Sequence, residues 1–475
     1  MGIKIYNTLT RAKEEFKTLK EGGIGMYVCG PTVYDAPHIG HARSAYVFDV
    51  IRRYFIYKGY KVKFVRNVTD VDDKIINKAK EEFKGEDINI AVKKISEKYL
   101  AVYHKGMGDL GIMRPDAEPK ATEYIEKMLR FIAALIKKEV SYESGGDVYF
   151  DIRKARGYGR LSNQSFEALE SGTRIAPGEN KKDPLDFALW KSAKEGEVSW
   201  PSPWGPGRPG WHIECSVMSS DILGDEFDIH GGGIDLIFPH HENEVAQSEG
   251  AGKSFARYWI HNGLLTINKE KMAKSLGNFI TIDDVLGKYP ADVLKILFLQ
   301  THYSHPVDFS WEKMEEAKKA WERFVLLFDK IDRDKGKGKR ENGKNKNQDV
   351  DEFCKMFEEA MDDDFNTAEA LAVLFDHVTA INKKLSVASC QPPELNHAKD
   401  ALLRLGKVFG LFERPWQKTI DKGMSEEKIR DLIKQRNTAR EKKDFTSADK
   451  IRKELDESGV ILEDTKDGTT WRRKI

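Results

Sequence analysis

The chain has 475 residues, a length that favours two to four domains over a single core. Its 78 Lys and Arg residues balance 77 Asp and Glu residues, so attraction of the whole chain to nucleic acid is not indicated, and any RNA contact would need local basic patches. Four cysteines are too few for a disulfide framework, and no apolar run has the length of a signal peptide or membrane helix. We expect a monomer in the reducing cytoplasm, with no membrane partner and with thiolates available to metals.

The first half of the chain shows a pattern of alternating strands and helices. In chain order the predicted elements are a strand at 24–29, a helix at 42–57, a strand at 60–69, helices at 87–110 and 121–138, an isolated strand at 148–152, a helix at 211–219, a strand at 227–230 and a helix at 244–249. Strand, helix and strand within 24–69 form a βαβ unit, which predicts a parallel sheet. The charged, turn-rich stretch 115–201 is interpreted as an insertion into this α/β domain.

The second half is predicted to be mainly helical. Its elements are helices at 282–289, 291–300 and 311–330, a helical bundle over 350–385 and 395–411, a charged helix pair at 425–458 and a two-stranded unit at 460–471. The run 333–348 has no apolar residue and predicts a flexible linker; a basic RNA-binding segment is the alternative. The predicted domains are 1–114 and 201–281 (the two halves of the α/β domain), 115–200 (insertion), 282–332 (connecting segment), 333–349 (basic loop), 350–415 (bundle) and 425–475 (C-terminal module).

Four residues far apart in the sequence carry the ligand types that a borderline-soft metal ion accepts. They are Cys29, Cys215, His240 and Glu244, the last two spaced to project from one helical face. The set predicts a zinc site with one ion per chain. A closed structural site is the alternative, but Cys29 lies close to a nucleotide-binding pattern, which favours a metal that contacts substrate. Cys354 and Cys390 lie in helical stretches and are interpreted as buried or free thiols.

Two short motifs indicate chemistry on a triphosphate. His38-Ile39-Gly40-His41 follows the first strand at the start of a helix, where free N–H groups favour phosphate and glycine permits close approach. Lys271-Met272-Ala273-Lys274-Ser275 places two ammonium groups on a turn that can stabilise departing pyrophosphate. Each motif alone is weak, because structural histidines and solvated lysines are common. Together, in this order, they form a strong signal.

These motifs resemble the signatures of class I aminoacyl-tRNA synthetases, and their surroundings are similar to those of the cysteinyl-tRNA synthetase family. The similar segments are 29–35 (CGPTVYD), 210–216 (GWHIECS), 238–244 (FPHHENE) and 468–473 (GTTWRR). The resemblance covers nearly the whole chain. Ala273 replaces the usual serine of the lysine motif, which leaves both lysines in place.

The resemblance implies a Rossmann-type class I catalytic domain with an insertion, followed by a helical bundle and an anticodon-binding module. It implies that the enzyme activates L-cysteine with ATP and Mg²⁺ and transfers it to tRNA(Cys), with zinc bound by the four predicted ligands. Catalysis is assigned to His38, His41, Lys271 and Lys274. ATP binding is assigned to His38, Gly40, His41, Asp235 and Lys274, and substrate binding to Cys29, Gly30, Thr69 and Trp211.

Some of these assignments have plain structural alternatives. Trp211 could simply pack in the core, and the Gly231–Gly233 run before Asp235 could be only a turn. His230 and His241 could be structural or could support metal ligands. For His212 a structural role is favoured. In the resembling family the positions of Arg440, Asp449 and Asp464 read the anticodon, although a solvated helix face explains most such charges.

Two rival functions stay open. One is an ATP-dependent ligase that joins cysteine to an amino-sugar, as in mycothiol synthesis, on the same scaffold without the tRNA-reading module. The other is a non-catalytic zinc- and RNA-binding protein. The C-terminal stretch 425–475 argues against the first, and the intact histidine and lysine motifs argue against the second.

Overall fold

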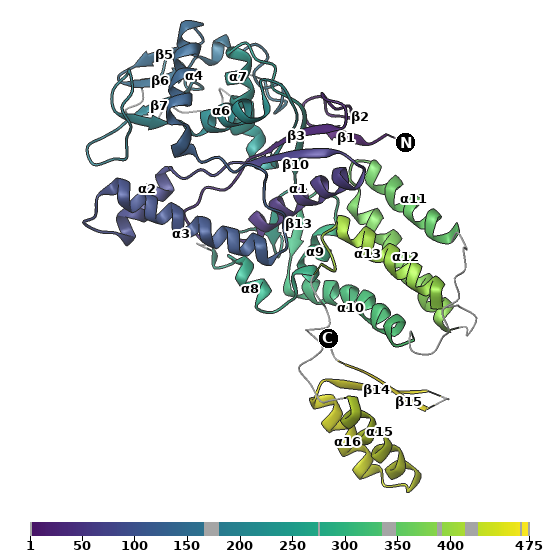
Figure 1. Cartoon of the computed structure of the whole chain (residues 1–475). Helices are drawn as coiled ribbons and strands as arrows, with labels where there is room; N and C mark the ends of the chain where they lie inside the picture. Colours follow the sequence, from purple (N-terminus) through teal and green to yellow (C-terminus); the bar gives the residue numbers. More distant parts are fainter. Residues whose placement is uncertain are drawn as a thin grey trace.

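The computed structural model describes residues 2–165, 180–273, 276–334, 348–386, 392–413, 426–465 and 468–473. Lys274, Cys390 and the 335–347 part of the predicted basic loop lie outside the described residues. Figure 1 shows an α/β body at the N-terminal side, a helical bundle beside it and a small C-terminal unit.

The centre of the α/β body is a parallel four-stranded sheet in the order β10-β9-β3-β4. Its strands are β3 (Gly23–Val28), β4 (Lys61–Arg66), β9 (Phe227–Gly233) and β10 (Ala256–Asn262). Helix α1 (Ile39–Tyr57) connects β3 to β4, as the predicted βαβ unit requires. Most residues of β3 and all of β9 except Gly233 are buried, as expected for strands covered on both faces. The predicted α/β class is confirmed.

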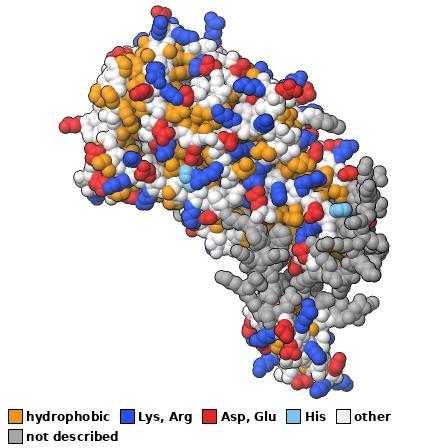
Figure 2. Space-filling view, viewed as in Figure 1, with side chains coloured by type: hydrophobic (Ala, Val, Ile, Leu, Met, Phe, Trp, Pro, Cys, Tyr) orange, Lys and Arg blue, Asp and Glu red, His pale blue; other side chains and the backbone are white. Residues whose placement is uncertain are grey.

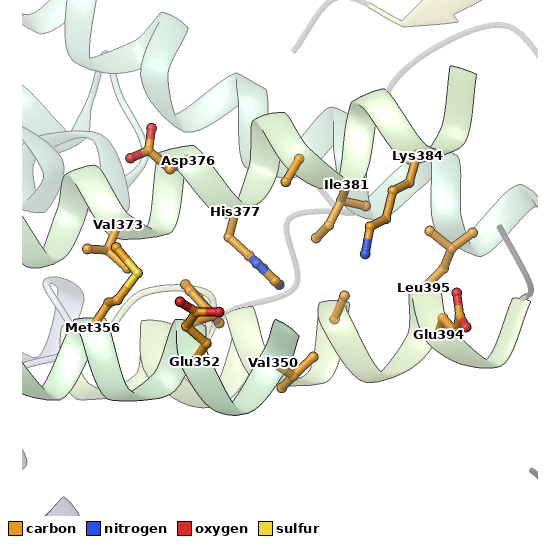
Figure 3. Close-up of a pocket in the computed structure, with 13 residues that line it drawn as sticks. Val350, Glu352, Met356, Val373, Asp376, His377, Ile381, Lys384, Glu394 and Leu395 are labelled. Carbon is orange, nitrogen blue, oxygen red and sulfur yellow. The ribbon is translucent and has the colours of Figure 1, made fainter. Parts of the chain in front are cut away.

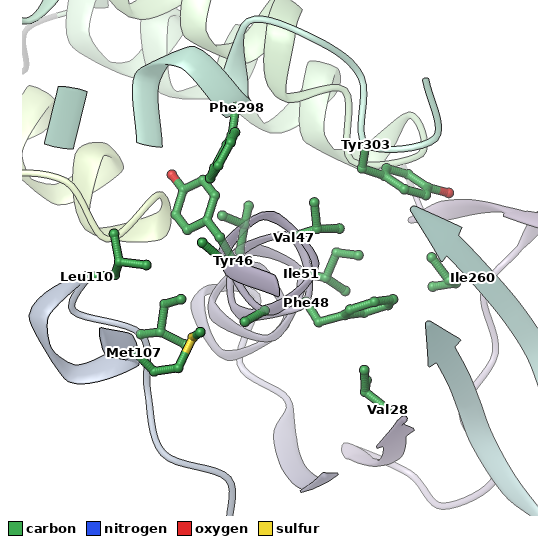
Figure 4. Close-up of a cluster of buried hydrophobic side chains, with 14 of the residues drawn as sticks. Val28, Tyr46, Val47, Phe48, Ile51, Met107, Leu110, Ile260, Phe298 and Tyr303 are labelled. Carbon is green, nitrogen blue, oxygen red and sulfur yellow. The ribbon is translucent and has the colours of Figure 1, made fainter. Parts of the chain in front are cut away.

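Helix α1 lies between this sheet and the helices that follow it in the chain. Figure 4 shows Phe48 directed toward the strands that carry Val28 and Ile260, while Tyr46 lies beside Phe298 of α9 (Ala291–Leu299). The Tyr46 and Phe298 ring centroids are 6.0 Å apart. Because both sides of α1 are packed, its position relative to the sheet is strongly fixed.

The insertion contains its own antiparallel sheet in the order β5-β6-β7-β8. The strands are β5 (Ser141–Ser144), β6 (Asp147–Phe150), β7 (Phe187–Ser192) and β8 (Gly207–Pro209). The prediction of an isolated strand at 148–152 is therefore wrong, because β6 pairs with strands on both sides. Strand β8 also extends the insertion past residue 200, since a short edge strand containing proline has little sequence signal.

The remaining elements complete the α/β body and its extension toward the bundle. They are β1 (Lys4–Asn7), β2 (Ala12–Glu15), α2 (Asp73–Glu82), α3 (Ile88–Asp109), α4 (Ile125–Lys137), α6 (Trp211–Leu223), α7 (Glu242–Gly250), β11 (Leu265–Ile267), β12 (Glu270–Lys271), α8 (Ile282–Leu286) and β13 (Val307–Phe309). Strands β12, β11 and β13 form a small sheet of their own.

The bundle consists of α10 (Trp311–Asp334), α11 (Gln348–Asp362), α12 (Thr367–Ser386) and α13 (Pro392–Val408). It is attached to α1, because Tyr46 donates a hydrogen bond to the carbonyl of Phe409 and Arg53 pairs with Glu413. Cys354 is a buried free thiol in α11, as predicted. Within the described part of the chain, no helix is long and apolar enough to cross a membrane.

The C-terminal unit is a helix pair followed by a hairpin, as predicted. It comprises α15 (Glu426–Glu441), α16 (Phe445–Glu457), β14 (Val460–Thr465) and β15 (Gly468–Arg473). Ile429, Leu455 and Val460 form a separate apolar core. Figure 2 shows basic and acidic side chains interspersed over the visible face, in keeping with the balanced net charge.

The contact between α1 and β9 predicts a large effect of one methyl group. A Cβ on Gly231 would overlap the ring of Phe48, whereas a Cβ on Gly25 of β3 would make ordinary contacts of 3.5 Å or more. We expect Gly231→Ala to lower the free energy of unfolding by about 1–3 kcal/mol, the usual cost of overpacking. Denaturant unfolding of Gly231→Ala and of the control Gly25→Ala measures this difference; equal stabilities would contradict it.

Candidate functional site

The predicted site residues gather where parallel strands end. Cys29 and Gly30 follow β3, and Thr69 follows β4. In the sheet, β4 lies next to β3 on one side, and β10 lies next to β9 on the other side. The direction in which strands are added therefore reverses between the central strands β3 and β9. The backbone N–H of Cys29 donates to the carbonyl of Gly231 across this point, at 3.1 Å. Open α/β sheets bind ligands in the crevice at such a point.

The four predicted metal ligands converge there from the end of β3, α6, the 237–241 turn and α7. Cys29 Sγ lies 3.7 Å from Cys215 Sγ of α6 and 3.6 Å from Glu244 Oε1 of α7. His240 Nε2 lies 3.0 Å from the same Glu244 oxygen. Cys215, His240 and Glu244 are each at most 1% exposed.

This spacing fits a tetrahedral metal ion. Ligands at zinc bond lengths of about 2.3 Å for sulfur and about 2.0–2.1 Å for nitrogen or oxygen are about 3.3–3.8 Å apart at the corners of a tetrahedron. The sulfur–sulfur and sulfur–oxygen distances agree, and the His240–Glu244 distance is slightly shorter. Among the described residues, Glu244 has ion pairs only with His230 and His240, so no Lys or Arg balances the two thiols and the carboxylate.

The charge states of Cys215, His240 and Glu244 favour a cation, whereas burial and the neighbouring Cys215 and Glu244 raise the pKa of the Cys29 thiol well above its usual range. Burial would raise the pKa of Glu244, but His230 and His240 lower it to about 2. Burial would also raise the pKa of Cys215, whereas hydrogen bonds from Cys29 and His240 lower it to about 6. Burial lowers the pKa of His240, and the Glu244 carboxylate overcomes this and raises it to about 10. A buried anionic cluster that draws a proton onto imidazole is a suitable place for a divalent ion.

Further histidines surround the predicted ligands. His241 Nε2 lies 3.3 Å from Cys29 Sγ, so Cys29, His240, His241 and Glu244 also form a compact group of possible metal ligands, without Cys215. The Nδ1 atom of His241 is 2.8 Å from Nε2 of His261. Because His241 is held by this second ring, it is placed to support Cys29, in the way outer residues usually orient metal ligands.

His212 has a closer relation to the site than the sequence indicates. Its Nδ1 atom lies 2.9 Å from Nδ1 of His240, which leaves Nε2 of His240 directed toward Glu244. This contact favours a ligand-supporting role for His212 over the merely structural role expected from the sequence. The GWHIECS motif contains this histidine, but only the packing of α6 against the 237–241 turn brings it to His240.

The substrate-side residues lie beside this cluster. The Trp211 ring stacks on His240 with centroids 4.1 Å apart and is 42% exposed, so Trp211 is not plain core packing. The buried Thr69 hydroxyl donates to Glu214 Oε2 at 2.7 Å. Burial and the nearby Cys215 raise the pKa of Glu214 well above its usual range. Sequence reasoning missed Glu214, although it stands next to Cys215 in the motif.

The two histidines of the His38–His41 motif cap α1 with their side chains. His38 Nδ1 accepts hydrogen bonds from the backbone N–H groups of Gly40 and His41, at 3.1 and 3.3 Å. His41 Nδ1 accepts from the N–H of His38, at 3.2 Å. Burial lowers the pKa of His38 to about 4; burial and the nearby His38 and Lys74 lower that of His41 to about 3. Both rings are therefore neutral near pH 7, with the proton on Nε2 available for donation.

Gly40 has a packing reason besides close approach of a ligand. A Cβ there would lie 2.9 Å from the His38 ring and 3.6 Å from the Met272 methyl group. Glycine thus allows the imidazole cap to form and allows the lysine motif to approach the start of α1. This second reason comes from contacts across 232 residues of chain, which the tetrapeptide alone does not indicate.

Lys271 is exposed at the end of β12, and Lys274 lies outside the described residues. The side chain of Asn278 joins the two sides of the motif, because it donates to the Lys271 carbonyl at 3.2 Å and accepts from the Ala273 N–H at 2.8 Å. The segment after the motif contacts the start of α1, where the Ile39 N–H donates to the Ile280 carbonyl at 3.1 Å. The two motifs are thereby brought together.

The glycine run before Asp235 is not a turn. Gly231, Gly232 and Gly233 are the last residues of β9, so the prediction that a strand ends at residue 230 is wrong. A Cβ on Gly232 would lie 2.7 Å from the His241 ring, which explains the need for glycine there. Asp235 is exposed just beyond the strand. Its position at a strand end is compatible with the assigned ATP contact.

In the C-terminal unit, Asp464 is held by two arginines. Arg436, which is 3% exposed, binds both Asp464 carboxylate oxygens at 2.9 and 2.8 Å, and Arg440 binds one of them at 3.1 Å. The hydrogen bond from Arg436 lowers the pKa of Asp464. Asp449 is exposed on α16. Sequence reasoning missed Arg436, whose role is visible only once the hairpin packs on α15.

A separate cavity of about 280 Å³ lies between α11, α12 and α13. Figure 3 shows its lining, in which Met356, Val373, Ile381 and Leu395 are apolar and His377 projects between the helices. The His377 ring stacks on Phe353 with centroids 3.8 Å apart. None of the predicted ATP, cysteine or metal residues lines it, so this cavity is not the candidate site.

Comparison with known families matches three successive parts of the chain. Residues 15–319 match the class I (C) tRNA synthetase catalytic domain, 356–413 match the DALR domain, and 425–472 match the cysteinyl-tRNA ligase anticodon binding domain. The cysteine–tRNA ligases of Thermodesulfovibrio yellowstonii and Bacillus velezensis are 48% and 47% identical to the chain, with both chains fully covered.

Similar solved structures show the same fold at low sequence identity. A putative arginyl-tRNA synthetase from Campylobacter jejuni has a TM-score of 0.56 at 16% identity and covers 83% of this chain and 93% of its own. A Mycobacterium tuberculosis methionyl-tRNA synthetase has a TM-score of 0.55 at 15% identity and covers 82% of this chain and 89% of its own. With its signature motifs meeting at the ends of the parallel strands, the chain belongs to the cysteinyl-tRNA synthetase family of class I aminoacyl-tRNA synthetases.

Proposed function

We propose that the chain activates L-cysteine with ATP and transfers the cysteinyl group to the 3′ end of tRNA(Cys). The observation that carries this proposal is the buried cluster of two thiols, an imidazole and a carboxylate at the strand ends, next to the helix that begins with the His38–His41 motif. Full-length relatives named cysteine–tRNA ligase support the same activity.

We assign one zinc ion to Cys29, Cys215, His240 and Glu244. Bound there, zinc supplies a soft partner for the substrate thiolate and a poor one for the hydroxyl of serine. Shape alone separates such near-isosteres by only about 10–200-fold. Trp211, stacked on His240 and partly exposed, forms a wall of the cysteine pocket, and Gly30 and the buried pair of Thr69 and Glu214 form its polar floor.

The first step joins the cysteine carboxylate to the α-phosphate of ATP and releases pyrophosphate. His38 and His41 donate hydrogen bonds from Nε2 to the phosphates, because their Nδ1 atoms are used by the helix cap. Lys271 and Lys274 stabilise the charge of the leaving pyrophosphate, with Mg²⁺ as its counter-ion. Asp235 accepts hydrogen bonds from the ribose. The side chains thus act by position and charge, without a covalent enzyme intermediate.

The second step transfers the cysteinyl group to tRNA, which the C-terminal unit recognises. Arg440, Asp449 and Asp464 are assigned to the anticodon, with Arg436 holding Asp464 in place. An amino-sugar acceptor requires no such unit, and the match of residues 425–472 to an anticodon binding domain argues against that rival. The cytoplasm, where tRNA and ATP are present, is the expected location, and a monomer is the expected state.

The metal assignment predicts a loss of zinc when one thiol is removed. Purified protein should contain about one zinc ion per chain, and Cys215→Ser should lower this content, because an alcohol binds zinc less well than a thiolate. Cys354→Ser is the matched control, since Cys354 is buried in α11 away from the cluster. Metal analysis of the three proteins decides the matter; wild-type protein without zinc contradicts the assignment.

The lysine motif predicts a defect confined to chemistry on the phosphates. Lys271→Ala should slow cysteine-dependent ATP–pyrophosphate exchange by about 10²–10³-fold, the scale for loss of one transition-state donor. Binding of cysteine should change little. Lys269→Ala serves as a control, because Lys269 is exposed between the same two strands but outside the motif. An exchange rate of Lys271→Ala equal to that of the control would refute the role.

The C-terminal unit predicts a separation of the two steps. Deletion of residues 425–475 should leave pyrophosphate exchange largely intact and strongly reduce transfer to tRNA, because an anticodon contact supplies binding energy far from the reacting atoms. Circular dichroism checks that the shortened chain is folded. We expect it to fold, because the deleted unit has an apolar core of its own. Normal charging of tRNA by a folded, shortened chain would contradict the tRNA-reading role of the C-terminal unit.

A further inference from the structure

Helix α1 contains a buried arginine that pairs with no carboxylate among the described residues. Arg43 lies two positions after His41 and is 1% exposed. Its two terminal nitrogens donate four hydrogen bonds, all to backbone carbonyls: those of Gly263, Leu264 (2.7 Å), Tyr303 (3.2 Å) and His305. Burial lowers its pKa to about 10, so it stays charged at neutral pH.

The four carbonyls belong to two segments that meet over the guanidinium. The Gly263 N–H donates to the Tyr303 carbonyl and the Val307 N–H donates to the Leu264 carbonyl, each at 2.9 Å. A Cβ on Gly263 would overlap the backbone of His305, so glycine is needed for this approach. Arg43 therefore fixes a junction and not a single loop.

This junction is the start of the small sheet that carries Lys271. One segment leads into β11 and the other into β13, and these strands pair in parallel from Leu265 and Val307 onward. Strand β12 pairs with β11, with Lys271 opposite Thr266. The position of Lys271 relative to α1 thus depends on how the first residues of β11 and β13 are held.

The segment after the lysine motif is fixed to the same helix by other contacts. The Ile39 N–H donates to the Ile280 carbonyl and the Ile282 N–H donates to the Pro37 carbonyl, each at 3.1 Å. The chain on both sides of the motif is therefore hydrogen-bonded to the start of α1. Among these hydrogen bonds, only those of Arg43 come from a side chain, so a substitution can remove them.

We propose that Arg43 is a positioning residue for adenylate formation, which holds the sheet carrying Lys271 in register with the helix carrying His38 and His41. The inference rests on the proposed function, because both motifs have to reach one triphosphate. A planar guanidinium can bind four carbonyls at once, whereas a lysine ammonium has three donors on a flexible stem. A displacement of about 1 Å in such a site costs about 10²-fold in rate.

The test is Arg43→Lys in the full-length, zinc-loaded protein, with Arg52→Lys as the matched control. Arg52 is on the same helix, is 5% exposed and binds the Arg114 carbonyl and Asp116; within the described residues, none of its hydrogen bonds reaches the small sheet. We expect Arg43→Lys to lower kcat of pyrophosphate exchange by about 10–10²-fold. KM for cysteine, zinc content and single-turnover transfer from isolated enzyme-bound adenylate to tRNA should match the control.

A double-mutant cycle tests whether Arg43 acts through Lys271. In the Lys271→Ala background the effect of Arg43→Lys should shrink, since the group it positions is gone. If the fold-reductions in exchange of the two single variants multiply fully in the double variant, the proposal is overturned. An equal loss of exchange and of transfer in Arg43→Lys also overturns it. If Arg43→Lys does not fold, the same measurements on Gly263→Ala test the proposal, because this substitution forces the same two segments apart. Absence of cysteine-dependent exchange in the wild type would instead reject the proposed function itself.

Discussion

The packing of α1 against the parallel sheet is the constraint on which the rest of the structure depends. The helix is buried along most of its length, with Phe48 fitted against Gly231 of β9 and Tyr46 beside α9. Its first turn carries the two histidines, its second turn holds Arg43, and its last turns bind the end of the bundle through Arg53 and Glu413. One rigid element thereby relates the nucleotide motifs, the small sheet and the helical bundle.

The same packing concentrates negative charge in the interior. The strand ends and helices α6 and α7 bring two thiols and the Glu244 carboxylate together, and among the residues that the structure describes only imidazoles form ion pairs with that carboxylate. Burying such a cluster is costly unless a cation joins it. The proposed phosphate side differs, because burial keeps His38 and His41 neutral and leaves their Nε2 atoms able to donate hydrogen bonds. We propose that the two sides of the site are matched to a soft thiolate and to a polyanion.

The sequence patterns were sufficient for the class of fold and for most helices. Long amphipathic stretches such as α3 and α10 have strong periodicity, and their observed ends lie close to the predicted ones. Short or irregular strands were lost or misjudged. β8 has three residues and a proline, and β9 continues through three glycines that propensity assigns to a turn. Gly231 and Gly232 are needed in the strand because Phe48 and His241 fill the space that side chains would occupy.

The sequence alone determined which residues were candidates for the chemistry and how the C-terminus folds. It identified the two motifs, the soft metal-ligand set and the C-terminal helix pair with its hairpin. These follow from local spacing, which a single chain reveals. Only the tertiary structure decided which groups support them. Four groups contact residues that are distant along the chain. Glu214 contacts Thr69, His212 contacts His240, Arg436 contacts Asp464, and Arg43 contacts the start of the small sheet. Such contacts depend on how elements pack, and packing brings together segments whose separation in sequence carries no signal of their proximity.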